Sequence, residues 1–150
     1  MKKLPLSYFM LAIIVLVLDQ VTKYFIKAHL GTFDTINVTS FFSIVYAENI
    51  GSAFGLFKSL GSTFFIMVSS LAVIALSVMI VKDLANRMPY SLLLGGAAGN
   101  LLDRLMRGYV VDFLDFHIGT FHWPAFNIAD SALTLGILFL FYSAVFKHAN

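Results

Sequence analysis

The feature that most constrains this chain is an uncharged apolar run from Leu60 to Val81. At about 1.5 Å of rise per residue, a helix of this length crosses the hydrocarbon core of a bilayer, which is about 30 Å thick. The composition agrees, since 59% of the 150 residues are hydrophobic and only 12% are charged. A globule of this size has too little interior to hide so much apolar surface. The sequence therefore predicts an integral membrane protein, with residues 1–150 forming a single domain.

Hydropathy predicts an all-α membrane core with four transmembrane helices. The first apolar run follows two lysines and could open a signal peptide, but a cleavable signal would end at a small-residue site. Here the run continues into Tyr24-Phe25-Ile26, so a retained span is expected. In the third span, Gly95 and Gly99 have the small-xxx-small spacing that lets helices approach closely in lipid. The predicted spans cover about residues 5–27, 60–82, 89–107 and 127–147.

Between the first two spans the pattern changes. Residues 32–39 alternate roughly with period two, and residues 41–46 are rich in aromatic and β-branched side chains, as in strands. A turn of small residues follows around Asn49. We expect a small β-rich extramembrane element over about residues 29–58, with an irregular loop as the alternative. Aromatic side chains could anchor it at the membrane interface, namely Phe41, Phe42 and Phe54, together with Trp123.

Polar residues concentrate at one end of the predicted bundle. In an up-down-up-down arrangement, the ends of the first and third spans meet the start of the fourth. Every acidic residue except Asp83 falls on this side. Charged side chains inside a bilayer are costly, so they usually face the bundle interior and mark function. The polar residues at these span ends are Asp19 and Lys23, then Asn100, Asp103 and Arg104, then Asn127 and Asp130.

Composition limits the chemistry that this site can perform. No cysteine is present, which excludes disulfides and thiol chemistry. A net charge of +2 without a basic tract gives no reason to expect nucleic-acid binding. No serine has a histidine or lysine partner at a recognisable spacing. His117 and His122 could bind a metal with Asp112 and Asp115, but they lack the paired spacing of metal-binding helices, so no metal is expected.

Carboxylate chemistry remains, and the candidate pair is Asp112 and Asp130, which we expect on either side of a short polar loop. Two aspartates that share a site cannot both ionise easily, so one holds a proton while the other acts as a base. Such a pair can activate water against an amide. Each acid also has a structural alternative, because Asp130 could simply stabilise the N-terminus of its helix. Similarly, Asp19 could neutralise Lys23 four residues later, and Asp103 could pair with Arg104 to orient the helices.

Two other functions compete with a protease. In a small cation transporter, intramembrane acids and a lysine would bind the cation, but acids near mid-span would then be expected. In a membrane scaffold, the charges would only orient helices.

The motifs around these residues resemble those of a known family. The chain closely resembles the lipoprotein signal peptidases, the signal peptidase II family of bacterial aspartyl membrane proteases. The segments that carry the resemblance are Leu18-Asp19-Gln20-Val21-Thr22-Lys23, Asn49-Ile50-Gly51-Ser52-Ala53-Phe54-Gly55, residues 95–104 (GGAAGNLLDR), Gly108-Tyr109-Val110-Val111-Asp112-Phe113 and residues 123–131 (WPAFNIADS). One departure is Ser52, where the family more often has alanine.

The resemblance implies the activity and the site. It implies an aspartic endopeptidase that removes the signal peptide from prolipoproteins, cutting on the amino side of a diacylglyceryl-modified cysteine without a cofactor. It implies a catalytic pair of Asp112 and Asp130, membrane lipid around the enzyme, a groove for globomycin-type inhibitors and a periplasmic sheet-like cradle at residues 29–58. The supporting residues that it implies are Asp19, Lys23, Asn49, Gly51, Asn100, Asp103, Arg104 and Asn127.

Orientation follows from the positively charged residues. Lysine and arginine are equally divided between the two predicted faces, but Lys23 and Arg104 belong to motifs in which the site explains them. Without these two, the basic residues favour the side of the termini, which the positive-inside rule places in the cytoplasm. We therefore expect an inner-membrane protein with both termini cytoplasmic and its active site at the periplasmic face.

Overall fold

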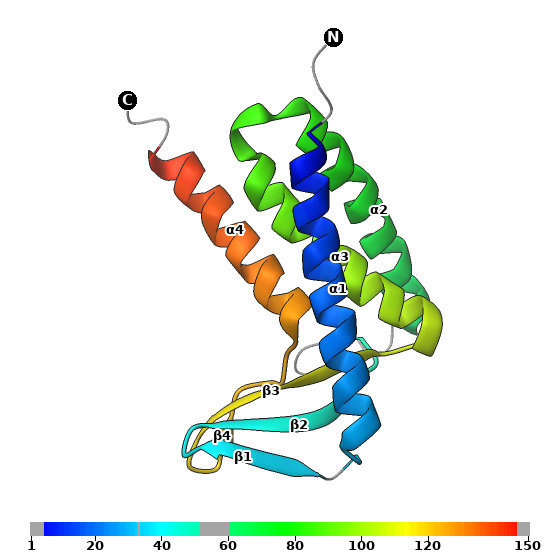
Figure 1. Cartoon of the computed structure of the whole chain (residues 1–150), viewed down its shortest axis with the longest axis vertical. Coiled ribbons are helices and arrows are strands. Elements are labelled where there is room, and N and C mark those ends of the chain that lie inside the picture. Colours follow the sequence, from blue (N-terminus) through cyan, green and yellow to red (C-terminus); the bar gives the residue numbers. More distant parts are fainter. Residues whose placement is uncertain (1–4, 33, 52–60, 147–150) are drawn as a thin grey trace.

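The computed structural model describes residues 5–32, 34–51 and 61–146. Its described part contains four long helices with a small sheet at one end of the bundle (Figure 1). The start of α1 and the end of α4 lie at the opposite end (Figure 1). The helices are α1 (Leu6–His29), α2 (Gly61–Lys82), α3 (Arg87–Arg107) and α4 (Ile128–Phe146), with a short 3₁₀ helix, η3 (Leu84–Asn86), before α3. The strands are β1 (Thr35–Thr39), β2 (Phe42–Asn49), β3 (Val110–Ile118) and β4 (Phe121–His122).

Helix α3 is the centre of the bundle, since it packs against α1, α2 and α4. Small residues make this possible. A methyl group at Gly95 would lie 2.7 Å from the Ala12 carbonyl oxygen of α1, and one at Gly96 would lie 2.5 Å from the Ala129 carbonyl oxygen of α4. The small-residue spacing noted in the sequence therefore serves packing between helices of the same chain.

Three helices in the described part of the chain are long and apolar enough to cross a membrane: α1, α2 from Ser62 and α4. Their outer faces expose large apolar side chains, such as Leu71 on α2 and Phe141 on α4, each 68% exposed. Helix α3 was also expected to span the membrane, but it is not apolar enough to be counted with these three helices. Its buried positions include Ser91, Asn100 and Asp103, because it faces protein on several sides.

The four strands form one antiparallel sheet in the order β1-β2-β3-β4. Strands in the 29–58 region are confirmed at β1 and β2, whereas residues 52–60, including Phe54 and Ser52, lie outside the described residues. The prediction of a polar loop between Asp112 and Asp130 was wrong, because β3 and β4 occupy residues 110–118 and 121–122. The run Val-Val-Asp-Phe-Leu-Asp-Phe-His-Ile is strand-like by its β-branched and aromatic content.

The sheet is firmly attached to the bundle. Gly108 ends α3 in the left-handed region, with φ of 81°, and so turns the chain from α3 into β3. The backbone N–H of Val111 then donates to Asp103 Oδ2 of α3 at 3.2 Å. On the other side of β3, the N–H of Leu114 donates to the Phe126 carbonyl at 2.8 Å, just before α4 begins. These attachments fix β3 against the start of α4.

Candidate active site

Asp112 lies on β3 and is only 3% exposed. Both of its carboxylate oxygens accept hydrogen bonds from amide side chains. Asn49, at the end of β2, donates from Nδ2 to Oδ2 at 2.9 Å, and Asn127 donates to Oδ1 at 2.7 Å. Asn49 is itself oriented by Gly51, whose N–H donates to Asn49 Oδ1 at 3.1 Å. The expected site residues Asn49 and Gly51 are therefore next to Asp112.

Gly51 occupies a position where a side chain would not fit. Its φ of 153° is a backbone conformation that favours glycine. A methyl group there would also lie 2.7 Å from the ring of Phe65 on α2. The turn after β2 therefore needs glycine for both its backbone and its space.

Asp130 lies in the first turn of α4. Asn127 precedes this helix and caps it, because Asn127 Oδ1 accepts from the Asp130 N–H at 2.9 Å. Asn100 of α3 donates from Nδ2 to Asp130 Oδ1 at 2.7 Å. The structure thus brings the two aspartates together through one shared residue, since Asn127 bonds to the carboxylate of Asp112 and to the backbone of Asp130.

Behind this pair lies a completely buried ionic cluster. The Lys23 ammonium contacts Asp19 at 2.7 Å and Asp103 at 2.9 Å, and all three side chains have no exposed surface. Lys23 also donates to Asn100 Oδ1 at 3.1 Å. The expected Asp19–Lys23 pair is present, but it belongs to this larger cluster. The alternative pairing of Asp103 with Arg104 was wrong, since the ion pairs of Asp103 are with Lys23 and Arg107.

The cluster also holds α4 in place. Asp19 Oδ1 accepts the N–H of Ala129 at 2.9 Å, so an acid of α1 binds the first turn of α4. Gln20, which was not selected from the sequence, donates to Asp103 Oδ1 at 3.0 Å and to the Gly99 carbonyl at 3.2 Å. Its position next to Asp19 in a polar segment was the available signal.

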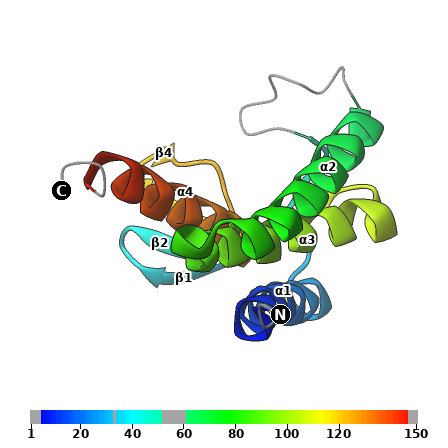
Figure 2. The same ribbon diagram turned by 90° about the horizontal axis from the view of Figure 1, so that it is seen from above.

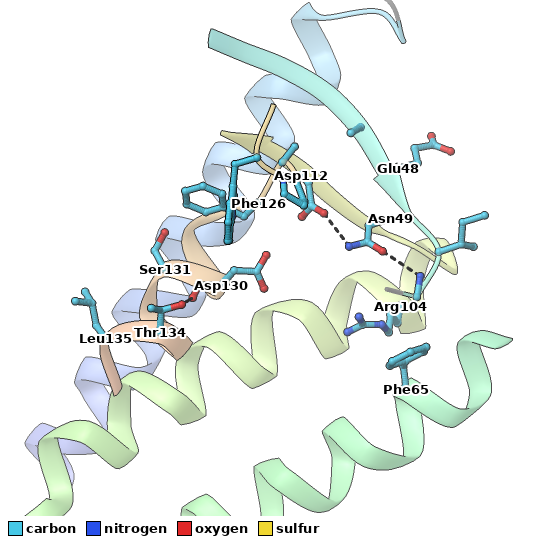
Figure 3. Close-up of a pocket in the computed structure, with 16 residues that line it drawn as sticks. Glu48, Asn49, Phe65, Arg104, Asp112, Phe126, Asp130, Ser131, Thr134 and Leu135 are labelled. Atoms are coloured by element: carbon cyan, nitrogen blue, oxygen red, sulfur yellow. Dashed lines mark hydrogen bonds between the residues drawn. The ribbon is translucent and has the colours of Figure 1, made fainter. Parts of the chain in front are cut away.

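A cavity of about 1030 Å³ opens beside the two aspartates (Figure 3). It exposes Asp112, Asp130 and Arg104, whereas Asp19, Lys23, Asn100, Asp103 and Asn127 do not line it. The Arg104 guanidinium stacks over the ring of Phe65, 5.2 Å from its centroid. The lining residues that were not among the predicted site residues are Ala47, Glu48, Ile50, Phe65, Trp123, Pro124, Ala125, Phe126, Ser131, Thr134 and Leu135.

The surroundings of Asp112 alter its acidity. Burial, and after it the nearby charge of Asp130, raise the pKa of its carboxyl from the usual 3.8 to about 7. The amide donors Asn49 and Asn127 act in the opposite direction. Below about pH 7 this pair of acids therefore retains a proton that a solvent-exposed aspartate would have lost.

Glu48 lies at the rim of the same cavity and is ionised more easily. The Tyr46 hydroxyl donates to Glu48 Oε1 at 2.6 Å, and this hydrogen bond lowers the pKa of Glu48. The pKa of the Glu48 carboxyl at the rim of the cavity is thus lowered, whereas the pKa of the Asp112 carboxyl at its base is raised.

The two histidines lie on the opposite face of the sheet. His117 and His122 are cross-strand partners whose rings stack with centroids 4.9 Å apart. His122 bonds Asp115 at 2.9 Å, and His117 Nε2 lies 3.0 Å from Ser43 Oγ. Asp112 belongs to another cluster, so the structure separates it from the other three residues of the metal alternative.

The fold and the cavity define a class: a helical membrane protein with two adjacent aspartates in an open cavity at one end of the bundle. The model of the family "Signal peptidase (SPase) II" matches residues 11–146. This match covers most of the chain, so the protein belongs to the signal peptidase II family, which is a family of bacterial membrane proteases.

Individual relatives agree with this assignment. The chain is 45% identical to a lipoprotein signal peptidase of Thermodesulfovibrio yellowstonii over 134 residues, which cover 89% of this chain and 91% of the relative. It is 42% identical to one of Francisella tularensis subsp. novicida, covering 94% and 92%. A bacterial membrane enzyme solved by the in meso method at 1.9 Å resolution is similar too, with a TM-score of 0.83, 36% identity and 93% of each chain covered.

Proposed function

We propose that this protein is an aspartic endopeptidase that removes signal peptides from prolipoproteins. Its substrate carries a diacylglyceryl group on a cysteine, and the enzyme cuts on the amino side of that cysteine. Membership in the signal peptidase II family supports signal-peptide removal from prolipoproteins. The observation that carries the catalytic assignment is that Asp112 and Asp130 line the same cavity and are joined through Asn127.

The proposed reaction begins with water between the two acids. The ionised carboxylate takes a proton from water while the protonated carboxyl donates its proton to the carbonyl oxygen of the scissile amide. A bond forms between the water oxygen and the carbonyl carbon, which gives a tetrahedral gem-diol. The two carboxyl groups have exchanged protonation states, so no charge has to leave the cavity.

The second step breaks the carbon–nitrogen bond. The newly protonated carboxyl donates to the departing nitrogen, and the other carboxylate accepts a proton from a gem-diol hydroxyl. The products are the carboxylic acid of the signal peptide and the free amine of the lipidated cysteine. The raised pKa of Asp112 supports this scheme, because it keeps one proton on the pair near neutral pH.

The remaining polar residues have proposed supporting roles. Asn49 and Asn127 orient Asp112, while Asn100 orients Asp130. Lys23 holds Asn100, while Asp19 and Asp103 fix the Lys23 ammonium group behind the pair. Arg104 lines the cavity itself, so we assign it to binding the substrate backbone. The same cavity is the proposed site for globomycin-type inhibitors.

A lipidated substrate fits the surroundings of the cavity. Leu135 and Thr134 of α4 line it, and Leu135 is 48% exposed on a helix that is apolar enough to cross the membrane. The cavity therefore borders the lipid-facing surface of the bundle. We propose that the acyl chains stay in lipid while the peptide bond reaches Asp112 and Asp130 from the side.

We further propose that the chain is a single four-span domain with both termini in the cytoplasm. Helix α3 runs the length of the bundle beside the three apolar helices, and its polar positions face protein rather than lipid. The ends of α1 and α4 that lie opposite the sheet would then be cytoplasmic and the cavity periplasmic (Figure 1). We expect an alkaline phosphatase domain fused after Asn150 to be inactive; an active fusion would reverse this orientation.

Purified enzyme in detergent micelles should process only the lipidated precursor. We expect it to cleave a prolipoprotein that carries diacylglyceryl-cysteine and to leave the same precursor without the lipid intact. Mass spectrometry of the products should place the new N-terminus at the cysteine. Equal cleavage of both precursors, or a cut elsewhere, would contradict the proposed substrate.

The rate should depend on pH through the proton that the pair retains. Because the pKa of Asp112 is raised to about 7, the singly protonated pair is present below this pH and is lost above it. We therefore expect kcat/KM to fall on the alkaline side with an apparent pKa near 7. A rate that stays constant well above this value would contradict the need for the proton.

A further inference from the structure

The outer part of the sheet carries an exposed cluster of large apolar side chains. This interfacial patch consists of Phe41, Phe116, Ile118, Phe121 and Trp123, which line a groove of about 440 Å³ together with His117. Ile118 is 82% exposed, Phe121 is 69% exposed and Trp123 is 57% exposed. Exposed apolar clusters of this kind mark binding or membrane surfaces.

Strand alternation puts the apolar and the polar side chains of the outer sheet on opposite faces. Asp112, Phe116 and Ile118 are separated by even intervals on β3, so they share one face. Cross-strand partners extend that face, since Phe42 pairs with Phe116 and Phe121 pairs with Ile118.

The other face of the outer sheet is polar. Ser43 of β2 pairs with Asp115 of β3, and its hydroxyl bonds both Asn37 of β1 and His117. His122 of β4 bonds Asp115. The outer sheet is therefore amphipathic, and its polar side chains satisfy one another on the side away from the Asp112 face.

The Asp112 face is directed toward the start of α4. Asp112 is bonded to Asn127 at the start of α4, and the ring of Phe126 stacks on Phe116 with centroids 5.8 Å apart. At the end of the bundle, the sheet projects to the same side as α4 (Figures 1 and 2). Its apolar face is thus on the same side as the lipid-crossing part of α4.

The surface is also continuous between the patch and α4. Trp123 lines both the outer groove and the cavity of the aspartates, and Leu135 of α4 lines the far part of that cavity. Both side chains are about half exposed. The cavity therefore connects the patch with the exposed surface of α4.

We propose that the interfacial patch inserts into the adjacent bilayer leaflet and binds phospholipid acyl chains near their headgroups. Aromatic side chains prefer this depth of a membrane. The polar face, with His122 and Asn37, then remains in water. By anchoring β3 on the membrane, the patch sets the depth at which Asp112 lies relative to the lipid.

Trp123 is the single tryptophan of the chain, so it reports on this patch directly. The experiment uses the full-length protein in nanodiscs at one copy per disc, without substrate. Fluorescence is quenched either by phosphatidylcholine brominated near the top of its acyl chains or by aqueous iodide. We expect strong quenching by the brominated lipid and weak quenching by iodide. The reverse pattern would overturn the proposal.

Variants at Phe121 and His122, which are neighbours on opposite faces of β4, provide a matched comparison. Phe121→Ser, combined with Ile118→Ser, should reduce quenching by brominated lipid and increase quenching by iodide. His122→Ser on the polar face should change neither, and thermal unfolding should show that both variants fold. Equal effects of the two variants would contradict the proposal. Protection that appears only with a second copy per disc, or only with lipidated substrate, would assign the patch to self-association or to the substrate's acyl chain instead.

Because the nanodiscs contain no substrate, this result is independent of the peptidase chemistry. A protein that cleaves prolipoproteins with Trp123 in water would refute the anchor alone. A lipid-anchored protein without cleavage would refute the proposed function alone.

Discussion

Asp112→Asn and Asp130→Asn should each abolish cleavage of a lipidated prolipoprotein, with a loss of at least about 10³-fold, as expected when a general acid or base is removed. Asparagine has nearly the same shape as aspartate but can neither accept the proton of water nor return one to the leaving nitrogen. The measurement is the initial rate of product formation in detergent micelles at equal concentrations of folded enzyme. Normal cleavage by either variant would refute the catalytic pair.

Thermal unfolding distinguishes lost chemistry from lost folding. The pKa of Asp112 is raised in the folded state, so the folded chain favours its neutral form. Its contribution to stability is therefore present below the usual pKa of 3.8 and is lost as pH rises through about 7. Asparagine is always neutral but can accept only one of the two hydrogen bonds from Asn49 and Asn127, so the stability of the D112N variant relative to the parent should increase as pH rises through about 7. An unfolded variant would leave Asp130→Asn as the decisive one.

A matched variant controls for the cavity. Ser131 follows Asp130 in α4 and also lines the cavity, but its hydroxyl donates to the Asn127 carbonyl at 3.0 Å and lies outside the proposed proton transfers. Ser131→Ala should therefore lower the rate only slightly. A loss as large as that of the Asp variants would show that any change in this cavity stops the reaction.

The second large effect concerns stability. Lys23→Met should destabilise the protein by about 3–5 kcal/mol, as when one partner of a buried ion pair is removed. Methionine has nearly the length of lysine but no ammonium group. The carboxylates of Asp19 and Asp103 would therefore lie close together without a positive charge between them. Both are completely buried, so water cannot replace it. The thermal unfolding midpoint in detergent measures the loss.

Lys27→Met is the control on the same helix. Lys27 is exposed and donates to the Tyr109 hydroxyl at 3.0 Å, so its removal leaves no buried charge. We expect a change of at most about 1 kcal/mol, in line with exposed charged contacts. Equal destabilisation by the two substitutions would contradict the structural role assigned to the Lys23 cluster.

Much of the fold was predictable because bilayers impose long apolar runs. The helices that became α1, α2 and α4 were each placed to within a few residues at both ends. Helix α3 was predicted as well. Its buried polar residues are explained by its central position among the other helices, which hydropathy alone does not reveal. Strand β3 was missed because its acids, Asp112 and Asp115, suggested a polar loop, although their neighbours are β-branched or aromatic.

The sequence predicted which residues gather at the candidate site, but not which of them line the cavity and which lie behind it. Polar residues at the ends of three spans had to converge, and they do. The sequence could not separate Asp112 and Asp130, which reach the cavity, from Lys23 and Asp103, which lie behind it. That distinction depends on which face of each helix is turned inward. Likewise, the pairing of Asp103 with Arg107 rather than with Arg104 follows from the i, i+4 geometry of α3.

The buried cluster has a consequence for how the chain enters the membrane. Asp19 and Lys23 are one turn apart on α1, and Asp103 and Arg107 are one turn apart on α3. Each helix thus carries its own counter-ion during insertion, which limits the cost of moving charge into lipid before the other helices arrive. When α3 docks against α1, Lys23 gains Asp103 as a second partner. Assembly would therefore begin from one ion pair within each helix and end with a shared ionic cluster.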